Sequence, residues 1–395
     1  MLTPLDFGIV SATLVVITFL ATLAQFGACQ LIVIAKNEEF RLIAFQSLFL
    51  NLCLSVLFSV LVFFFATTIS EHLSSTDLSL YIKAMTPIII IKALTSSFEG
   101  ALIRDNHFKY IAISSTISFI IGYFAIAMLL ILMDFGVWSL ILANLTQSLI
   151  YCVMLLNKSK PSFRGMTYSL QGLWNNIVRA SYISYAQIIS NVAGQIDNYF
   201  VSKFLGVETL GVYSRAYQLM VVPCNFIGQM INQVFLKEFA NESREKTIKI
   251  IKYSIILNIV LSSSVVLTLW AYGTNLVIFL LGEQWAIILA PLLLLSVSIY
   301  PRILYKIGEP ILYSNNKLSN VAIFSTIYLS SIAIFSMMLL QYGILGISTA
   351  VLIGTMLYGF SVFIKVINLY PEIKVVFYSS LAVYLLIGTL VLHYV

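Results

Sequence analysis

The sequence predicts an all-α, polytopic membrane protein, and three observations carry that prediction. Of its 395 residues, 60% are hydrophobic and only 10% are charged, whereas a soluble domain carries roughly 25% charge. The mean hydropathy is +0.98. Apolar runs of the roughly 20 residues that a membrane helix needs follow one another almost from end to end. A soluble enzyme, a nucleic-acid-binding protein and a disordered tail are thereby excluded, and the runs are too continuous for a transmembrane barrel.

Twelve apolar runs bounded by charged or turn residues are each predicted to be a membrane-spanning helix. The ninth run holds Pro301 and Pro310, which are expected to kink it, and the stretch Leu276–Leu281 is expected to lie at a membrane interface. Many of the 22 tyrosines lie near the ends of runs, as an interfacial belt requires. In chain order the runs are Phe7–Leu31, Phe45–Ile69, Leu80–Leu102, Tyr110–Met133, Val137–Leu156, Ile177–Ser202, Leu210–Val234, Ile250–Ala271, Ala286–Tyr313, Ser319–Leu340, Ile347–Ile367 and Val375–Val395.

The positive charges predict the orientation of these spans. Every second loop is rich in Lys and Arg: these loops and the residues at their edges together hold 16 of the 22 Lys and Arg residues. The loops between them hold only Lys203. Loops rich in Lys and Arg are cytoplasmic. Both chain ends would then lie on the other side, so we expect the chain to lack one span at each end; the alternative is a natural twelve-span protein. The basic loops are 32–44, 103–109, 157–176, 235–249, 314–318 and 368–374.

Three short matches at nearly one offset predict an internal repeat. Residues 7–11 (FGIVS) match 210–214 (LGVYS) at an offset of 203 between the glycines. Phe135-Gly136 matches Tyr342-Gly343 at 207, and Asn106 to Lys109 matches Asn316-Lys317 at 208. A step of six spans gives two lobes of the same orientation. Parallel repeats are one common plan of transporters, with the substrate site between the halves.

The predicted organisation is therefore two six-helix lobes in parallel repeat, the first lacking its first helix, plus a C-terminal helix. Residues 1–156 form an N-terminal lobe with five visible spans, and the basic stretch 157–176 is a cytoplasmic linker. Residues 177–367 form a C-terminal lobe of six spans, and residues 368–395 form an additional transmembrane helix.

Ordered motifs from residue 2 to about 370 resemble those of bacterial polysaccharide-export flippases. Residues 2–8 (LTPLDFG) resemble the family's LTPEDFG, and residues 135–140 (FGVWSL) its G-x-W-a-L. Residues 197–217, which contain DNY, LG and LGVYSRAY, resemble its most recognisable segment, and residues 281–285 (LGEQW) match f-G-x-x-W. One departure is Gln25, where the family has the Asp of a D-x-G motif. The resemblance is to the lipopolysaccharide O-antigen flippase branch of the multidrug/oligosaccharidyl-lipid/polysaccharide superfamily.

The resemblance implies two six-helix lobes with two further helices, of which helices one and fourteen are missing here. It implies a flippase in the bacterial inner membrane that moves undecaprenyl-diphosphate-linked oligosaccharide by alternating access, for O-antigen, exopolysaccharide or capsule. Expected partners are this lipid-linked oligosaccharide, membrane lipid and other polysaccharide-assembly proteins, with no nucleic acid. No cofactor or metal is expected, and the absence of a G-x-x-x-x-G-K-[ST] run leaves an ion or substrate gradient as the energy source.

The ninth span carries the densest set of charges. Ser298, Arg302, Lys306, Glu309 and Tyr313 share one helical face. A charge within the bilayer is costly and usually faces a cavity or a partner. Because a guanidinium suits bidentate contact with an oxyanion, Arg302 and Lys306 are predicted to bind the substrate diphosphate. The alternative is a salt bridge between Lys306 and Glu309 that docks two helices.

The third span holds Lys92 and Glu99, seven residues apart on one face with Ser96 between them. Lys92 is a candidate substrate-binding residue, and Glu99 a candidate for ion coupling or charge pairing, as is Glu309 in the ninth span. Lys83 points about 180° away and lies near the outer end, where snorkelling is cheap, so it is left out.

The sixth span carries a polar stripe that acts either as helix–helix glue or as the wall of an aqueous path. Because sugars favour amide partners, Asn191, Gln195 and Asn198 are predicted to contact substrate. Asp197 is predicted either to bind a coupling cation or to pair with Arg215. Arg215 lies five residues inside the seventh span, where it either binds substrate or extends its charged end to the membrane surface. The stripe consists of Gln187, Asn191, Gly194 and Asn198, flanked by Gln195 and Asp197.

Three alternatives to a flippase remain open. A cation-coupled drug efflux transporter of the same superfamily would favour an acidic and aromatic cavity, against which the five intramembrane cations argue. A membrane O-antigen polymerase would need a sizeable external loop, whereas the longest non-cytoplasmic loop, 272–285, has Glu283 as its one charge. An inactive truncated fragment is the third, because a lobe without one helix has an unfilled groove.

Overall fold

The computed structural model describes residues 2–25, 27–34, 40–73, 78–159, 185, 188–238, 244–315 and 317–393, and in these ranges the protein is all-α without a β-strand. This confirms the predicted fold class. The chain forms two compact units. Unit 1 comprises residues 1–195 and 206–211, and unit 2 comprises residues 196–205 and 212–395.

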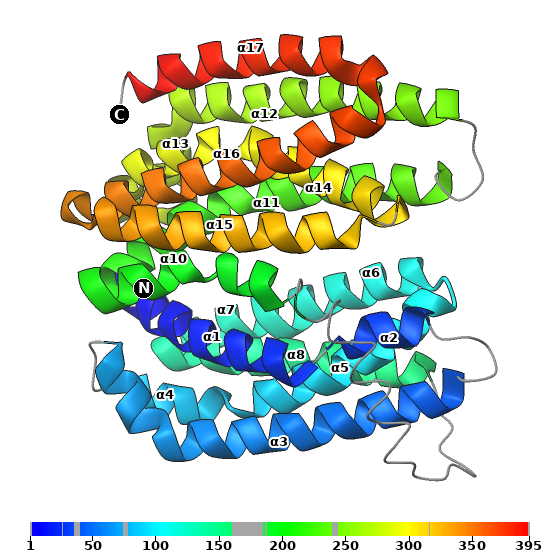
Figure 1. Cartoon of the computed structure of the whole chain (residues 1–395). Helices are drawn as coiled ribbons and strands as arrows, with labels where there is room; N and C mark the ends of the chain where they lie inside the picture. The colour runs from blue at the N-terminus through cyan, green and yellow to red at the C-terminus, as the bar shows by residue number, and fades with distance from the viewer. Residues whose placement is uncertain are drawn as a thin grey trace. The chain divides into compact units, whose positions relative to one another are not determined.

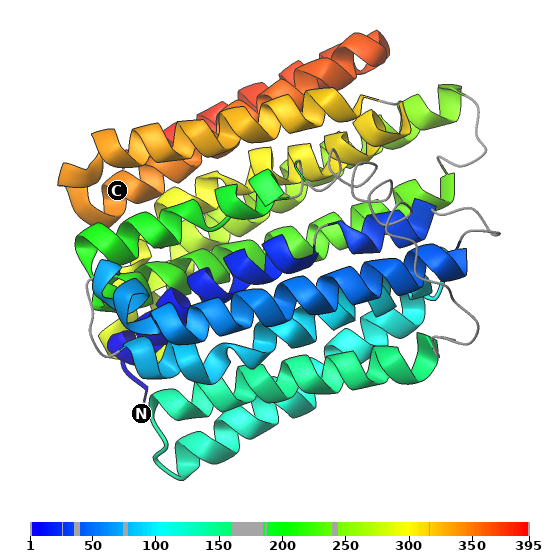
Figure 2. The ribbon, with the colours of Figure 1, turned by 60° about the horizontal axis from the view of Figure 1, so that its bottom comes forward.

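Unit 1 is built from helices that pack against α5, which contacts α1, α2, α3 and α8. The long helices α1 and α3 lie side by side (Figure 2). Its elements are α1 (Pro4–Gln25), α2 (Ala28–Ile34), α3 (Phe40–His72), α4 (Leu78–Met85), α5 (Pro87–Arg104), α6 (Phe108–Ile117), the π-helical η1 (Ser118–Ala125), α7 (Ile126–Leu132) and α8 (Val137–Ser159).

Unit 2 has α14 near its centre, in contact with α12, α15 and α16, while α17 packs along α12 (Figure 1). Its elements are α10 (Ile196–Phe200), the π-helical η2 (Val201–Leu205), α11 (Val207–Glu238, whose first turn belongs to unit 1), α12 (Arg244–Leu281), η3 (Glu283–Ile288), α13 (Leu289–Val297), α14 (Ile299–Ser314), α15 (Leu318–Met338), η4 (Leu340–Tyr342), α16 (Gly343–Leu369), η5 (Pro371–Ile373) and α17 (Lys374–Leu392).

Within the described residues, nine helices or continuous helix pairs are long and apolar enough to cross a membrane, and a bent pair, residues 283–297 with 299–312, would be a tenth. Of the twelve predicted spans, Ile177–Ser202 lies largely outside the described residues. The predicted span Leu210–Val234 corresponds to α11, which is long but not among the apolar helices. Polar residues such as Arg215, Gln218 and Asn225 lower its hydropathy.

Three predicted helices have different limits in the structure. The run Phe7–Leu31 is broken before α2, where Gly27 has φ 65°, a conformation that glycine adopts without steric cost. The run Leu80–Leu102 divides at Thr86 because Pro87, which lacks an N–H, opens α5. The predicted loop 272–285 is wrong over most of its length, since α12 continues through Leu281. At 38 residues, α12 is about 57 Å long and exceeds the roughly 30 Å of hydrocarbon.

The basic loops gather at one end of each unit. In unit 1, Arg104 donates to the Ile32 carbonyl at 3.4 Å and stacks on Phe40, and Lys158 lies over the Tyr110 ring. The loops 32–44, 103–109 and the start of 157–176 are therefore neighbours. In unit 2 the same holds for the loops at 235–249, 314–318 and 368–374, through Arg244, Tyr370 and Asn315. Such an end is what the predicted cytoplasmic face requires.

One buried contact recurs at the offset that the sequence repeat predicts. In unit 1, the Asn51 Nδ2 donates to the Ala93 carbonyl at 3.2 Å. In unit 2, the Asn258 Nδ2 donates to the Tyr300 carbonyl, also at 3.2 Å. Donors and acceptors are each 207 residues apart, and both asparagines are fully buried. Gly136 and Gly343, one of the matched pairs, both have positive φ, 52° and 61°, before α8 and at the start of α16. These equivalences favour the predicted repeat.

The glycines of the matched FGIVS and LGVYS segments meet where α1 crosses the first turn of α11 in unit 1. A Cβ at Gly8 would lie 1.9 Å from the Val207 carbonyl oxygen, and one at Gly211 would lie 1.7 Å from the Pro4 carbonyl oxygen. Real Cβ atoms do not come closer than 3.0 Å to such atoms. The two backbones can therefore cross this closely because neither crossing residue has a side chain.

Candidate functional site

The charged face of the ninth predicted span lies on α14, and a bend sets its direction. The helix breaks at Ser298, and the pair of helices bends by 41° there. Pro301, three residues later, removes one helical N–H, and its ring clashes with the carbonyl four residues earlier. The predicted kink of Pro301 is thus present. Pro310 lies inside α14, which continues to Ser314.

Arg302 is the most deeply buried cation of this face, with an exposed fraction of 5%. Its Nε donates to Ser298 Oγ at 3.2 Å, and its Nη1 donates to Tyr217 Oη at 3.0 Å. The guanidinium also lies 5.0 Å from the centre of the Tyr217 ring, a distance at which a cation is attracted to the ring face. Its Nη2 is buried and has no hydrogen-bond partner among the described residues. A buried donor without a partner is costly, so this guanidinium retains capacity for one more acceptor.

Lys306 and Glu309 point to different partners on neighbouring helices. The half-buried Lys306 donates from Nζ to Asn225 Oδ1 on α11 at 2.7 Å. Tyr358 on α16 donates from Oη to Glu309 Oε1 at 2.6 Å and shares a 3.2 Å hydrogen bond with Ser325. The alternative of a salt bridge between Lys306 and Glu309 is wrong, because each side chain has its own partner and no ion pair joins these two described residues.

Asp197 on α10 lies in the core of unit 2 with an exposed fraction of 1%. Its Oδ2 accepts from Tyr213 Oη at 2.6 Å, and its Oδ1 accepts from the backbone N–H of Asn198 at 2.9 Å. Arg302 lies close enough to act on its charge. Among the described residues, the hydrogen-bond partners of the Asp197 carboxylate are Tyr213 and Asn198, and no ion pair with Arg215 is observed. Arg215 is half-buried on α11 and has contacts of its own.

The predicted pair in the third span lies on α5 of unit 1. Lys92 and Glu99 are both half-buried. Neither forms a hydrogen bond or an ion pair with another described residue. The Glu99 carboxylate is near Cys29 of α2 and Tyr151 of α8, and the Cys29 backbone packs against Gly100. Glu99 thus lies beside the break between α1 and α2.

The polar stripe of the sixth span is not one continuous helical face. The helix tightens at Gly194 and Gln195, where Gln195 N–H bonds to the Val192 carbonyl three residues back. Glycine favours such an interruption because it is a poor helix former. Asn191 and Gln195 accordingly belong to unit 1, while Asn198 belongs to unit 2. Gln187 lies outside the described residues.

The partners of these charges are residues that sequence reasoning missed. Tyr213 and Tyr358 are buried in the core and Tyr217 is half-buried, so these three tyrosines are not part of an interfacial belt. Their spacing offered one signal: Tyr213 and Tyr217 are four residues apart and share a helical face with Met220 and Cys224. Nothing in the sequence indicated which charges they would meet, because those charges lie on other helices.

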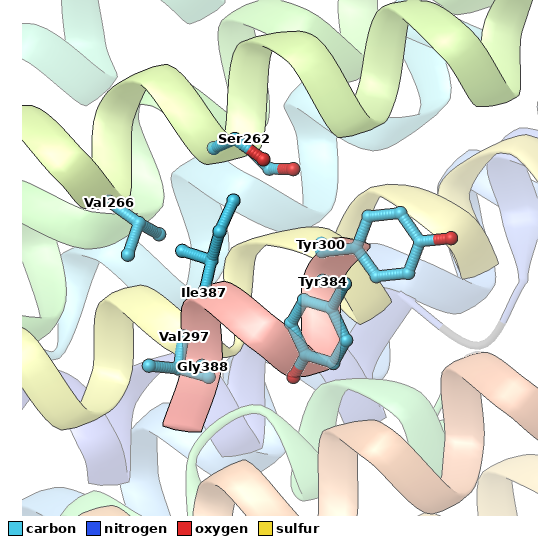
Figure 3. A pocket seen from close by; sticks show the side chains of 8 residues that line it. Ser262, Val266, Val297, Tyr300, Tyr384, Ile387 and Gly388 are labelled. Carbon is cyan, nitrogen blue, oxygen red and sulfur yellow. The ribbon is translucent and has the colours of Figure 1, made fainter. Parts of the chain in front are cut away.

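A small cavity lies between α12, α13, α14 and α17 (Figure 3). Ser262, Val297 and Gly388 line it, and the Tyr300 and Tyr384 rings stack at 4.7 Å on one side. Its volume of about 10 Å³ is at the lower limit for a single water molecule. The cavity is therefore too small for a substrate, and it marks where α17 packs against α12, α13 and α14 within unit 2.

Comparison with known protein families shows to which family the chain belongs. The family described as "Polysaccharide biosynthesis protein" matches residues 1–290. The chain belongs to this family. The match covers all of unit 1 and continues through unit 2 to the start of α13, and thus includes Asp197 and Tyr217 but not Arg302.

Two curated relatives are similar over about three quarters of the chain. The succinoglycan biosynthesis transport protein ExoT of Rhizobium meliloti is 27% identical over 304 residues, which are 75% of this chain and 60% of that protein. The lipopolysaccharide biosynthesis protein WzxC of Escherichia coli is 24% identical over 314 residues, 78% of this chain and 62% of that protein. The chain spans about three fifths of the length of these relatives.

Solved structures share the fold at low sequence identity. The lipid II flippase MurJ in an inward closed conformation matches with a TM-score of 0.74 and 14% identity, over 97% of this chain and 91% of that one. An inward-facing multidrug resistance MATE family transporter of the MOP superfamily matches with a TM-score of 0.69 and 13% identity, over 98% and 92%. The protein is thus a multi-pass membrane protein with the fold of this superfamily.

Proposed function

We propose that this protein moves undecaprenyl-diphosphate-linked oligosaccharide across the bacterial inner membrane by alternating access, as a step in assembling a surface polysaccharide. Family membership supports a role in polysaccharide biosynthesis. The names of the two relatives, one a transport protein for succinoglycan biosynthesis and one a lipopolysaccharide biosynthesis protein, support transport of such a product. The fold shared with a lipid II flippase supports a lipid-linked substrate.

The observation that carries the proposal is the cationic face of α14. Arg302 keeps a buried Nη2 without a partner, and Lys306 follows one helical turn later with its ammonium on an exposed asparagine, Asn225. A diphosphate offers several oxyanion acceptors, which suit a guanidinium fork and a point-like ammonium. Since Arg302 is nearly enclosed, Lys306 makes the first contact, and Arg302 meets the diphosphate when the surrounding helices part.

The remaining predicted residues have supporting roles in this proposal. Lys92 and Arg215 add positive charge along the path of the headgroup, and Asn198 offers an amide to the sugars. The carboxylates Asp197, Glu309 and Glu99 either bind the coupling ion or balance nearby cations. Their placement within membrane helices supports a role, because a charge is retained at such depth where function requires it. Expected partners remain membrane lipid and the polysaccharide-assembly proteins that supply and consume the substrate.

The test is a flipping assay with the purified full chain in liposomes. The probe is undecaprenyl-diphosphate-linked oligosaccharide with a fluorescent NBD group on its sugar, and dithionite added outside bleaches the probe in the outer leaflet. Active protein makes nearly all of the probe accessible, whereas protein-free liposomes protect about half. Arg302→Ala and Lys306→Ala are expected to show the protein-free result, and the exposed-lysine control Lys249→Ala the wild-type result.

Two outcomes would contradict the proposal. Wild-type flipping by both α14 variants, at equal protein content, would remove the diphosphate role of this face. Wild-type protein that leaves the probe protected but moves a cationic dye across the membrane would favour the drug-efflux alternative. Both readouts use the same liposomes, so protein content and orientation are matched.

A further inference from the structure

A second polar feature lies within unit 1. Two residue pairs, each four apart, line an open depression with a volume of about 50 Å³: Thr18 and Thr22 on α1, and Asn191 and Gln195 on the segment 188–195. Phe19 and Val192 complete the lining. Residues four apart on a helix present neighbouring side chains about 5–6 Å from each other. The depression therefore has a pair of hydroxyl groups on one side and a pair of amide groups on the other, with the Phe19 ring beside them.

The two threonines donate their hydroxyl hydrogen bonds within α1 and not to the segment 188–195. Polar side chains in membrane helices commonly bond across helices as glue. Here Thr18 Oγ1 donates to the Leu14 carbonyl at 2.6 Å, and Thr22 Oγ1 donates to the Thr18 carbonyl at 2.9 Å, both within α1. Neither threonine forms a hydrogen bond with Asn191 in the part of the chain that the structure describes. The threonine oxygens keep lone pairs that can accept a hydrogen bond.

Asn191 is the most available member of the set. Its side chain is exposed, and its amide forms no hydrogen bond with another described residue. It therefore offers two donors and one acceptor in the predicted sixth span, and an unsatisfied amide is costly within a bilayer. Phe19, 41% exposed, presents an aromatic surface beside this amide. An apolar surface with a few directed polar groups is the usual composition of a small-molecule site.

We propose that this depression binds one neutral sugar residue of the lipid-linked oligosaccharide, a proposal that rests on the proposed function. A pyranose ring has hydroxyl groups along its edge, which would meet the Asn191 and Gln195 amides and the threonine oxygens. It also has a face of C–H groups, which would lie on the Phe19 ring, whose π face is electron-rich. None of the six lining residues is charged, so the site selects a neutral sugar rather than a diphosphate or an acidic sugar.

The proposal assigns the recognition of the substrate to two separate sets of residues. The cations of α14 meet the diphosphate, which all undecaprenyl-diphosphate substrates share, and the unit 1 depression meets a sugar, which differs between polysaccharides. Thr18 and Thr22 then become specificity residues that no charge or motif in the sequence indicated. Substitutions in the unit 1 depression change which sugar is preferred, whereas substitutions on α14 weaken the binding of every substrate alike.

The test compares binding of four lipids by the purified full chain in detergent. The probes are undecaprenyl diphosphate alone and the same lipid bearing one glucose, galactose or N-acetylglucosamine residue. Wild-type protein is expected to bind at least one glycosylated probe about tenfold more tightly than the bare lipid. Thr22→Val and Asn191→Ala are expected to reduce this gain about five- to tenfold each, the size of one lost hydrogen bond, with unchanged affinity for the bare lipid.

Matched controls separate recognition from folding. Thr13 on the same helix also donates to a carbonyl four residues back, at 2.8 Å, but lies outside the depression, so Thr13→Val is expected to keep the full gain. Equal binding of all four lipids by wild-type protein would overturn the proposal, as would an undiminished gain in both depression variants. Failure of the proposed function is distinct, because it would appear as an unchanged affinity of Lys306→Ala for the bare lipid.

Discussion

The crossing of α1 and α11 in unit 1 allows a stability prediction whose size follows from the structure. In Gly211→Ala, the new Cβ would lie 1.7 Å from the Pro4 carbonyl oxygen and 2.7 Å from its carbonyl carbon. Reaching the 3.0 Å that real Cβ atoms need requires a displacement of at least about 1.3 Å. The obstacle is backbone, so no side-chain rotation relieves it, and the two helices must separate.

The expected cost is the balance of two terms. Overpacking a close contact costs about 1–3 kcal/mol, and alanine in place of a helical glycine returns up to about 1 kcal/mol through helix propensity. We expect Gly211→Ala to lower the free energy of unfolding by about 1–2 kcal/mol. Gly8→Ala, whose Cβ would lie 1.9 Å from the Val207 carbonyl oxygen, should cost a similar amount. Once one alanine has separated the helices, the second meets less resistance, so the double variant should cost less than the sum.

The assay is unfolding of the purified protein in one detergent, followed by intrinsic fluorescence over a temperature ramp. Gly388→Ala is the matched control, because its Cβ would meet Val297 at an ordinary 3.4 Å. The two crossing variants should unfold a few degrees below wild type, and the control within one degree of it. Crossing variants that unfold with the control, or a double variant whose loss is the plain sum of the single losses, would refute the reasoning.

Three further predictions test other contacts. Asn51→Ala and Asn258→Ala should each lower the free energy of unfolding by about 1–3 kcal/mol, because each removes an equivalent buried hydrogen bond; a loss in one variant alone, measured by the same thermal unfolding, would speak against the repeat. Tyr358→Phe removes the 2.6 Å donor to Glu309, so it should lower the unfolding temperature and slow flipping of the NBD probe; wild-type values in both would contradict the role of this contact. Arg244 forms an exposed ion pair with Glu372 at 3.3 Å, and Arg244→Ala should leave the unfolding temperature unchanged at physiological salt, because exposed ion pairs contribute little and are screened; a clear drop would show that its stacking on the Tyr370 ring matters more.

The composition was sufficient to predict an all-α, polytopic membrane protein. The pattern of charges was sufficient to predict that the basic loops lie at one end of each unit. A membrane helix needs a hydrophobic run of a certain length. This length can be read from each segment alone, without knowledge of how the helices pack. The repeat offsets were also readable, and Asn51 and Asn258 recur at the 207-residue step that one of those matches indicated. Local chemistry predicted the kink at Pro301 for the same reason, since a missing N–H acts within one turn.

The partners of the charged residues were decided by tertiary structure. Sequence spacing placed Arg302, Lys306 and Glu309 on one face, yet could not show that they would reach Tyr217, Asn225 and Tyr358. These partners come from α11 and α16, which are distant in sequence from α14. Helix periodicity fixes the direction of a side chain relative to its own axis, but which helix lies in that direction depends on how the helices pack.

The breaks in helices show the same division. Pro87 and Gly27 are visible in the sequence, but a long apolar run hides a break when both halves remain hydrophobic. The unit 1 depression likewise depends on two segments more than 160 residues apart, α1 and 188–195. Each segment determines the polar groups that it carries. Only the packing of the two segments determines that these groups face one depression, because contact between distant segments is a property of the whole fold.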